Sequence, residues 1–272
     1  MASSLGNAAH LWAVSVHEPP LGWETLRSVL TEEERAYASR FRQSADQLRS
    51  ILARGILRLV LGRHLEVEPE RIQLSRSQNG KPELAGSLAG AIEFNVSHAG
   101  GWVLVGLTRG GRIGVDVEQL REVADHGEIA ARFFAPEEAR AIEALPEEER
   151  RCEFLAYWTC KEAYLKALGT GLGTEMNTFA VRFGGERPKL VCVGGGGAVR
   201  SADWTIWTGS PEPGYMAAAA IHAPDVDIRA NCWTASGLHP WFSSTLSADS
   251  LLNPTASRRT ARSQENGPFR GC

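Results

Sequence analysis

Two long amphipathic helical segments, set among runs of short strands, constrain the fold of this chain most strongly. The first is predicted over Leu48–Val60, where apolar residues recur at helical spacing. The second is predicted over Glu147–Leu168, with Gly169 placed to cap it. Strand-like segments surround them at residues 11–16, 91–97, 103–108, 112–118, 179–183, 190–193, 204–208 and 215–221. This order predicts an α+β protein with two halves of similar content, although no residue-level repeat is present.

Several local signals predict where elements begin and turn. Residues 31–34 and residues 44–47 each match a capping box, the second at the start of the first long helix. The pair Gly110-Gly111 separates two strand-like segments, so we expect a β-hairpin there. The run Gly194–Gly197 lacks the Lys-Ser/Thr ending of a P-loop, so we expect a flexible hairpin loop.

Composition excludes several classes of protein. The 272 residues carry 29 Lys and Arg against 32 Asp and Glu, a net charge of -3, whereas nucleic-acid binders usually show a basic excess. Apolar runs such as residues 216–221 are too short to span a membrane, and the N-terminus lacks the pattern of a secretory signal. Five cysteines without C-x-x-C spacing indicate free thiols in a reducing compartment. We therefore expect a cytoplasmic protein.

The last part of the chain differs in composition from the rest. It is rich in Ser, Thr, Arg, Gly and Asn without periodicity, so we expect a disordered tail over residues 234–272. Trp233, Trp241 and Phe242 would allow the start of this tail to dock. The predicted organisation is thus an N-terminal α+β subdomain at 1–108, a C-terminal α+β subdomain at 109–233, and the tail.

The segment Gly114–Glu118 carries two carboxylates on one face of a predicted strand. Side chains alternate along a strand, so Asp116 and Glu118 point one way while Val115 and Val117 point into the core. Two carboxylates this close repel each other unless a cation lies between them, and Mg²⁺ prefers such oxygen ligands. A solvated, exposed strand face is the alternative that this segment alone leaves open.

A second cluster lies on the second long helix. Trp158, Glu162 and Lys166 are spaced four residues apart and therefore share one helical face. A plain salt bridge between Glu162 and Lys166 is the simplest explanation of that pair.

A third cluster, Asn95–Gly101, runs from a strand end into a glycine turn. The hydroxyl of Ser97, the imidazole of His98 and the exposed amides would suit a phosphate, although a turn-capping serine beside a surface histidine is the alternative. Arg49 and Ser50 lie near the N-terminal end of the first long helix, where free amides favour an anion.

Taken in order, the segments NVSHAGGW, GVDVE and WTCKEAYLKALGTGL resemble the signatures of the Sfp-type 4′-phosphopantetheinyl transferases. Gly80-Lys81-Pro82 and Arg132-Phe133-Phe134 fit the same family, and the resemblance spans residues 10–230. It implies two α+β subdomains related by a pseudo-twofold axis. It also implies a Mg²⁺-dependent enzyme that moves the phosphopantetheine arm of coenzyme A onto a serine of an apo carrier protein of acyl, peptidyl or polyketide type, releasing adenosine 3′,5′-bisphosphate.

The resemblance also implies roles for single residues. The metal carboxylates would be Asp116, Glu118 and Glu162, with Glu162 as metal ligand, general base or both. Lys166 would offset charge on the leaving nucleotide, and Glu138 aligns with a further acid. The contacts to coenzyme A would come from Arg49, Ser50, Lys81, Ser97, His98 and Lys166.

One segment departs from the family pattern. Some members hold the 3′-phosphate of coenzyme A with lysines where this chain has Glu34 and Tyr37, so Arg35, Arg40 or Arg42 would have to substitute. Another Mg²⁺-dependent phosphate chemistry, a non-catalytic binding module and a purely structural domain are the rival functions. Two halves in one chain favour a monomer, and neither a nucleic-acid nor a membrane partner is expected.

Overall fold

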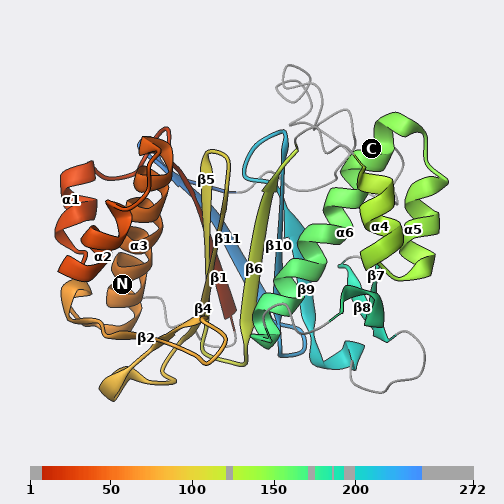
Figure 1. Cartoon of the computed structure of the whole chain (residues 1–272). Helices are drawn as coiled ribbons and strands as arrows, with labels where there is room; N and C mark the ends of the chain where they lie inside the picture. The colour runs from red at the N-terminus through yellow and green to blue at the C-terminus, as the bar shows by residue number, and fades with distance from the viewer. Residues whose placement is uncertain (1–7, 121–124, 171–174, 186, 193–199, 241–272) are drawn as a thin grey trace.

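Two β-sheets pack face to face at the centre of the molecule, and helices cover their outer faces (Figure 1). The computed structural model describes residues 8–120, 125–170, 175–185, 187–192 and 200–240. The first sheet has the strand order β12-β11-β1-β5-β4 and the second has the order β6-β10-β9. β1 and β11 run parallel, and the other paired strands are antiparallel.

The elements have the following bounds. The first sheet contains β1 (Ala8–Ser15), β4 (Glu93–Ala99), β5 (Trp102–Thr108), β11 (Asp227–Thr234) and β12 (Gly237–Pro240), and the second contains β6 (Ile113–Gln119), β9 (Thr205–Gly209) and β10 (Tyr215–Ile221). β2 (Leu74–Arg76) pairs with β3 (Pro82–Leu84), and β7 (Phe179–Arg182) pairs with β8 (Lys189–Cys192). The helices are α1 (Trp23–Ser28), α2 (Glu32–Ala38), α3 (Ser44–Leu65), α4 (His126–Phe133), α5 (Pro136–Glu143) and α6 (Glu147–Leu168).

The central strand β10 shows why the layers pack so closely. Its four consecutive alanines, Ala217–Ala220, are completely buried. Ala217 and Ala219 face the first sheet, while Ala218 and Ala220 face α6. Only small side chains allow both a sheet and a helix to approach the same strand. The mixed helices and sheets confirm the predicted α+β class.

The long helices and one cap agree with the sequence analysis. α3 and α6 each have 22 residues, and α6 ends at Gly169, which takes a left-handed φ of 70°. The hydroxyl of Thr31 accepts from the amide of Glu34, whose carboxylate accepts from the amide of Thr31, so the first capping box is confirmed.

Two local predictions are wrong. Ser44 is the first residue of α3 rather than its cap, since Gln43 is the N-cap and makes no side-chain capping bond. Gly110-Gly111 does not close a hairpin, because β5 pairs with β1 and β4 while β6 pairs with β10 in the other sheet. The glycine pair instead carries the chain from one sheet to the other, and local composition does not distinguish these two cases.

The end of the described chain returns to the first sheet. β11 pairs with β1, and β12 pairs with β11. Residues 227–240, assigned above to the second subdomain and the tail, thus complete the first sheet. Residues 241–272, including Trp241 and Phe242, and the glycine run at 194–197 lie outside the described residues. None of the described helices has the length and apolar character needed to cross a membrane.

Candidate active site

The carboxylates predicted on β6 face helix α6 at the junction of the two halves. Val115 and Val117 are buried between the sheets, so Asp116 and Glu118 point to the opposite side. Gly114 lets α6 lie directly on the strand, because a Cβ atom there would be 2.0 Å from the carbonyl oxygen of Ala163. Residues far apart in the sequence therefore meet at this contact.

Asp116 is the centre of the polar contacts. It is 2% exposed, and its Oδ1 accepts hydrogen bonds from Lys166 Nζ at 2.6 Å and from Ser97 Oγ at 2.9 Å. Burial raises the pKa of Asp116, and the charge of Lys166 opposes that shift. Its other oxygen, Oδ2, is buried without a hydrogen-bond partner in the described part of the chain.

Glu118 and Glu162 add further negative charge to the same place. Burial, with the charge of Asp116 as the next cause, raises the pKa of Glu118 to about 7. Burial also raises the pKa of Glu162, against the opposing charge of Lys166. Trp158 lies close enough to Glu118 to oppose a small part of that rise in pKa. The face Trp158–Glu162–Lys166 predicted on α6 is therefore turned toward β6.

The donor set fits a hard divalent cation in type and in charge. Carboxylate oxygens are the ligands that Mg²⁺ prefers, and the unpartnered Oδ2 of Asp116 leaves one buried oxygen available. Within the described ranges, no three His, Cys, Asp or Glu side chains are grouped closely enough to hold a metal ion. Binding of one ion by all three carboxylates would thus require some of these side chains to move closer together.

The residues of β4 divide between two surfaces. Ser97 faces β6, where it also accepts from the Lys166 ammonium at 3.1 Å, whereas the neighbouring His98 is exposed on the side of α3. Loss of solvent around the ring and the charge of Arg49 lower the pKa of His98. Arg49 pairs with Asp46, and its guanidinium lies 3.4 Å from the carbonyl oxygen of Gly100.

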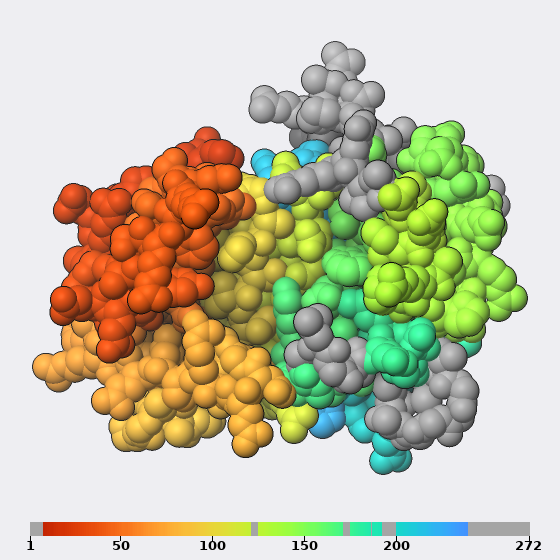
Figure 2. Space-filling view, viewed as in Figure 1, coloured from red at the N-terminus to blue at the C-terminus, as the bar shows by residue number. Residues whose placement is uncertain are grey.

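Ser50 follows Arg49 on α3 and is half-buried. The charge of Lys166 also lowers the pKa of His98. Figure 2 shows a hollow between the red and orange N-terminal helices and the green helices.

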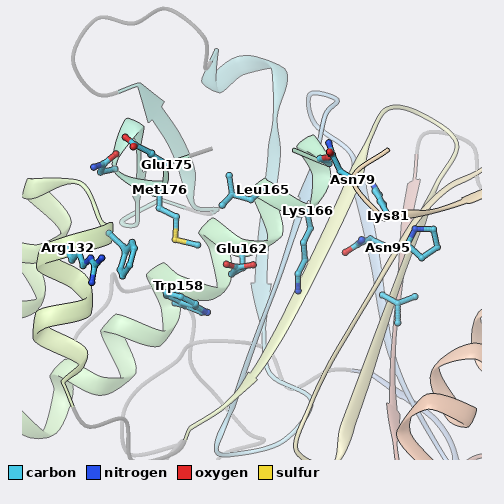
Figure 3. A pocket seen from close by; sticks show the side chains of 16 residues that line it. Asn79, Lys81, Asn95, Arg132, Trp158, Glu162, Leu165, Lys166, Glu175 and Met176 are labelled. Carbon is cyan, nitrogen blue, oxygen red and sulfur yellow. The ribbon is translucent and has the colours of Figure 1, made fainter. Parts of the chain in front are cut away.

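A pocket of about 790 Å³ opens beside this cluster (Figure 3). Glu162 and Lys166 point into it from α6, and Lys81 borders it from the turn before β3. The Lys81 ammonium donates to the carbonyl oxygen of Ile113 at 3.0 Å, and burial lowers the pKa of Lys81. Met176 also lines the pocket, although no sequence motif pointed to it. The lining residues are Asn79–Pro82, Asn95, Val96, Arg132, Phe133, Trp158, Glu162, Leu165, Lys166, Gly169 and Glu175–Asn177.

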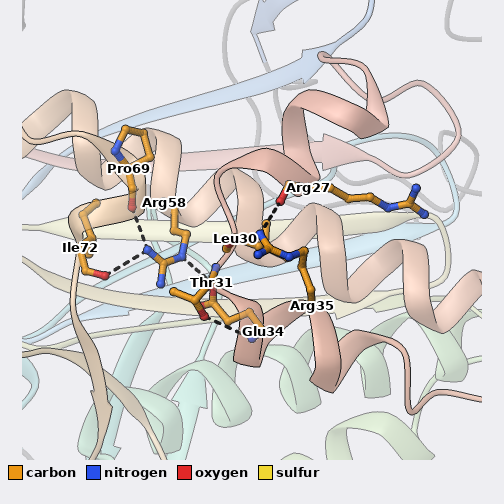
Figure 4. A network of polar contacts seen from close by, with 8 residues as sticks. All are labelled: Arg27, Leu30, Thr31, Glu34, Arg35, Arg58, Pro69 and Ile72. Carbon is orange, nitrogen blue, oxygen red and sulfur yellow. Dashed lines mark hydrogen bonds and ion pairs between the residues drawn. The ribbon is translucent and has the colours of Figure 1, made fainter.

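Glu34, which the resemblance aligned with a phosphate contact, has a structural role. Besides capping α2, its carboxylate accepts from Arg58 Nε at 2.7 Å (Figure 4). Arg58 is 2% exposed and also donates to the carbonyl oxygens of Pro69 and Ile72. Arg35 is engaged with the carbonyl oxygen of Leu30.

Tyr37, Arg40 and Arg42 are exposed, and the ring of Tyr37 packs edge-on against Phe41. Arg40 and Arg42, with Arg35, remain the predicted substitutes for the missing lysines.

A second buried ion pair lies behind the pocket. Lys161 is completely buried, and its ammonium is 2.7 Å from Glu138 Oε2. It also donates to the carbonyl oxygens of Met176 at 2.8 Å and Phe179 at 2.6 Å. Glu138 further accepts from the amides of Ala135 and Val181. The ion pair therefore links the segment that carries Met176, on one side of the pocket, to α6. Glu138 does not face the carboxylates of β6.

Comparison with known proteins decides the family. The model for the N-terminal region of 4′-phosphopantetheinyl transferases matches residues 11–108, and the model for the 4′-phosphopantetheinyl transferase superfamily matches residues 112–220. The 4′-phosphopantetheinyl transferase HetI of Nostoc is 38% identical over 169 residues, which cover 62% of this chain and 71% of HetI. The chain belongs to the 4′-phosphopantetheinyl transferase superfamily.

Other members of the superfamily are similar over comparable lengths. The 4′-phosphopantetheinyl transferase Sfp of Bacillus subtilis is 31% identical over 159 residues, covering 58% of this chain and 69% of Sfp. A 4′-phosphopantetheinyl transferase of Bacillus pumilus is 28% identical over 201 residues, covering 74% of this chain and 82% of that protein. The resemblance deduced from the three sequence clusters is confirmed, and the chain is a phosphopantetheinyl transferase of the Sfp and HetI type.

Proposed function

We propose that this transferase uses Mg²⁺ and coenzyme A to convert apo carrier proteins of acyl, peptidyl or polyketide type to their holo forms. The observation that carries the proposal is the meeting of Asp116, Glu118, Glu162 and Lys166 at one end of a pocket between the two halves. Acids with raised pKa values beside a lysine suit a strongly anionic substrate together with a divalent cation.

The metal would be held by Asp116, Glu118 and Glu162. When bound, Mg²⁺ would supply positive charge next to the pyrophosphate of coenzyme A and so stabilise the departing nucleotide phosphate. Without the metal these carboxylates repel one another, which is consistent with the raised pKa of Glu118 and Glu162.

Side chains of this protein would activate the nucleophile and stabilise the leaving group. The serine hydroxyl of the carrier attacks the β-phosphorus of coenzyme A, and the bond to the departing nucleotide phosphate breaks. A serine is a poor nucleophile unless a base takes its proton, and Glu162, whose raised pKa improves its basicity, is the proposed base. Lys166 would stabilise the negative charge that grows on the nucleotide.

Basic and polar residues around the junction would hold the substrate. Arg49, Ser50 and His98 on the side of α3 and Lys81 beside the pocket are the proposed contacts. Ser97 is the remaining proposed phosphate contact. Its hydroxyl is hydrogen-bonded to Asp116 and Lys166.

Intact mass measurement of an apo carrier protein tests the proposal directly. Incubation with enzyme, coenzyme A and Mg²⁺ should add one phosphopantetheine, and a chelator should prevent the addition. Glu162→Gln should remove most of the transfer while leaving the fold intact. Glu153→Gln, which changes another partly buried carboxylate of α6, is the matched control.

Two outcomes would contradict the proposal. If coenzyme A binds but no carrier gains mass, the chain is a binding module. If Glu162→Gln retains native turnover, the assignment of the base is wrong.

A further inference from the structure

Side chains of the first half cover the free edge of β6. Val115 N donates to Asn95 Oδ1 at 2.9 Å, and Val117 N donates to Ser97 Oγ at 3.4 Å. Both acceptors belong to β4, so side-chain hydrogen bonds join the two halves where a neighbouring strand would otherwise pair. β4 then passes into β5 through the turn Gly100-Gly101, which lies at the same junction.

A hydroxyl of the second half holds this turn. Gly101 N donates to the hydroxyl oxygen of Tyr215 at 3.0 Å, and Tyr215 is 6% exposed at the start of β10. The approach is close, because a Cβ atom at Gly100 would be 2.3 Å from that oxygen and 2.5 Å from Gln119 Oε1. The sequence predicted exposed amides at this turn, but the Gly101 amide is buried and occupied by Tyr215.

The same turn is held from the other side by the first half. Val16 N donates to the carbonyl oxygen of Gly101 at 2.8 Å, and a Cβ atom at Gly101 would be 2.7 Å from the ring of His17. The carbonyl oxygen of Gly100 accepts from Arg49 Nη1 on α3 at 3.4 Å. This carbonyl and the N–H of Gly101 belong to one peptide group, so Tyr215 and Arg49 hold its two ends from opposite halves of the molecule.

One peptide group couples these two side chains. A peptide is planar, so a rotation that moves its N–H also moves its C=O. Without the Tyr215 hydroxyl, the buried N–H of Gly101 would lack an acceptor, and such a group is costly enough to drive the peptide toward another partner. The carbonyl oxygen of Gly100 would then leave the guanidinium of Arg49.

We propose that Tyr215 is a positioning residue for the transfer reaction, which fixes the peptide between Gly100 and Gly101 and, through it, the guanidinium of Arg49. The inference rests on the proposed function, in which Arg49 helps to hold the substrate. Tyr215 acts through this peptide and not through contact with the reacting groups.

Tyr215→Phe tests the inference, because it removes the hydroxyl and keeps the ring. Tyr157→Phe is the matched control, since Tyr157 is similarly buried at 7% exposed, but its ring contacts Phe134 and Phe183 within the second half. The carrier mass assay gives kcat and the KM for coenzyme A and for the carrier, and thermal unfolding gives Tm. Repeating Tyr215→Phe in an Arg49→Ala chain completes a double-mutant cycle, which measures whether the hydroxyl acts through Arg49.

We expect Tyr215→Phe to raise the KM for coenzyme A about fivefold while kcat and the carrier KM change less than about twofold, because a misplaced Arg49 weakens binding without disturbing the reacting groups. Tyr157→Phe should change each constant less than about twofold. In the Arg49→Ala chain, Tyr215→Phe should raise the KM for coenzyme A less than about twofold further.

An unchanged KM for coenzyme A in Tyr215→Phe would overturn the inference, and so would an undiminished rise in that KM in the Arg49→Ala chain. Parallel losses of kcat, carrier KM and Tm would assign Tyr215 a structural role only and would also overturn it. If the wild-type chain transfers nothing to any carrier, the proposed function fails and this inference fails with it. A negative Tyr215→Phe result with an active wild type overturns this inference alone.

Discussion

Replacing Gly114 by alanine should force α6 away from β6. A Cβ atom at this position would be 2.0 Å from the carbonyl oxygen of Ala163 and 2.3 Å from the amide nitrogen of Ala167. Both neighbours are backbone atoms of α6, so no side-chain rotation relieves the contact. Gly114 is therefore required by the approach of the helix and not by its own backbone conformation.

The size of the effect follows from these distances. Cβ atoms essentially never approach other heavy atoms within 3.0 Å, so the helix must withdraw by roughly 1 Å. Overpacking of this kind costs about 1–3 kcal/mol of unfolding free energy. The same movement displaces Glu162 and Lys166 from Asp116, and a misplacement of about 1 Å in an active site can reduce turnover about 100-fold.

Urea denaturation and the carrier mass assay together check this prediction. Gly127→Ala in α4 is the control, because among the described residues no atom outside its own helix backbone and chain neighbours lies within 4 Å of the added Cβ. We expect Gly114→Ala to lose both stability and transfer, and Gly127→Ala to lose neither. A Gly114→Ala protein with native unfolding free energy and native turnover would refute the packing argument.

Three further changes have calculable consequences. Lys161→Met leaves the buried Glu138 carboxylate without its partner, so urea denaturation should show a loss of about 3–5 kcal/mol in unfolding free energy. The control Arg182→Gln, at an exposed ion pair, should lose less than about 1 kcal/mol. Equal losses in the two variants would disprove the argument. In the metal-free protein Glu118, with its pKa raised from 4.5 to about 7, holds a proton more tightly when folded, so unfolding free energy should fall as pH rises through this interval. Glu118→Gln should flatten that fall, and an unchanged slope in urea titrations at pH 5 and pH 8 would contradict it. Chelation of Mg²⁺ should abolish transfer in the mass assay, with recovery on adding Mg²⁺ back; transfer that persists in excess chelator would exclude a metal requirement.

Local patterns in the sequence were sufficient to predict the helix and the strand on which the candidate catalytic residues lie. Helical spacing and Gly169 defined α6 over Glu147–Leu168, because both periodicity and a left-handed cap are properties of neighbouring residues. Strand alternation likewise placed Asp116 and Glu118 on one face, opposite the buried valines. The three ordered clusters were then specific enough to indicate the family.

The partners of these residues depended on the tertiary structure. Ser97 and His98 are neighbours in sequence, yet Ser97 bonds Asp116 while His98 lies near Arg49. The resemblance aligned Glu34 with a phosphate contact, but the packing of α2 on α3 pairs it with Arg58.

The amino-acid sequence alone therefore determined the elements, the face on which each acid lies, and the family. The tertiary structure decided that β5 and β6 belong to different sheets and that Asn95 covers the edge of β6. The reason is physical: periodicity and caps arise from residues within a few positions of one another. A contact across two sheets depends instead on which surfaces become buried together, and no local pattern records that.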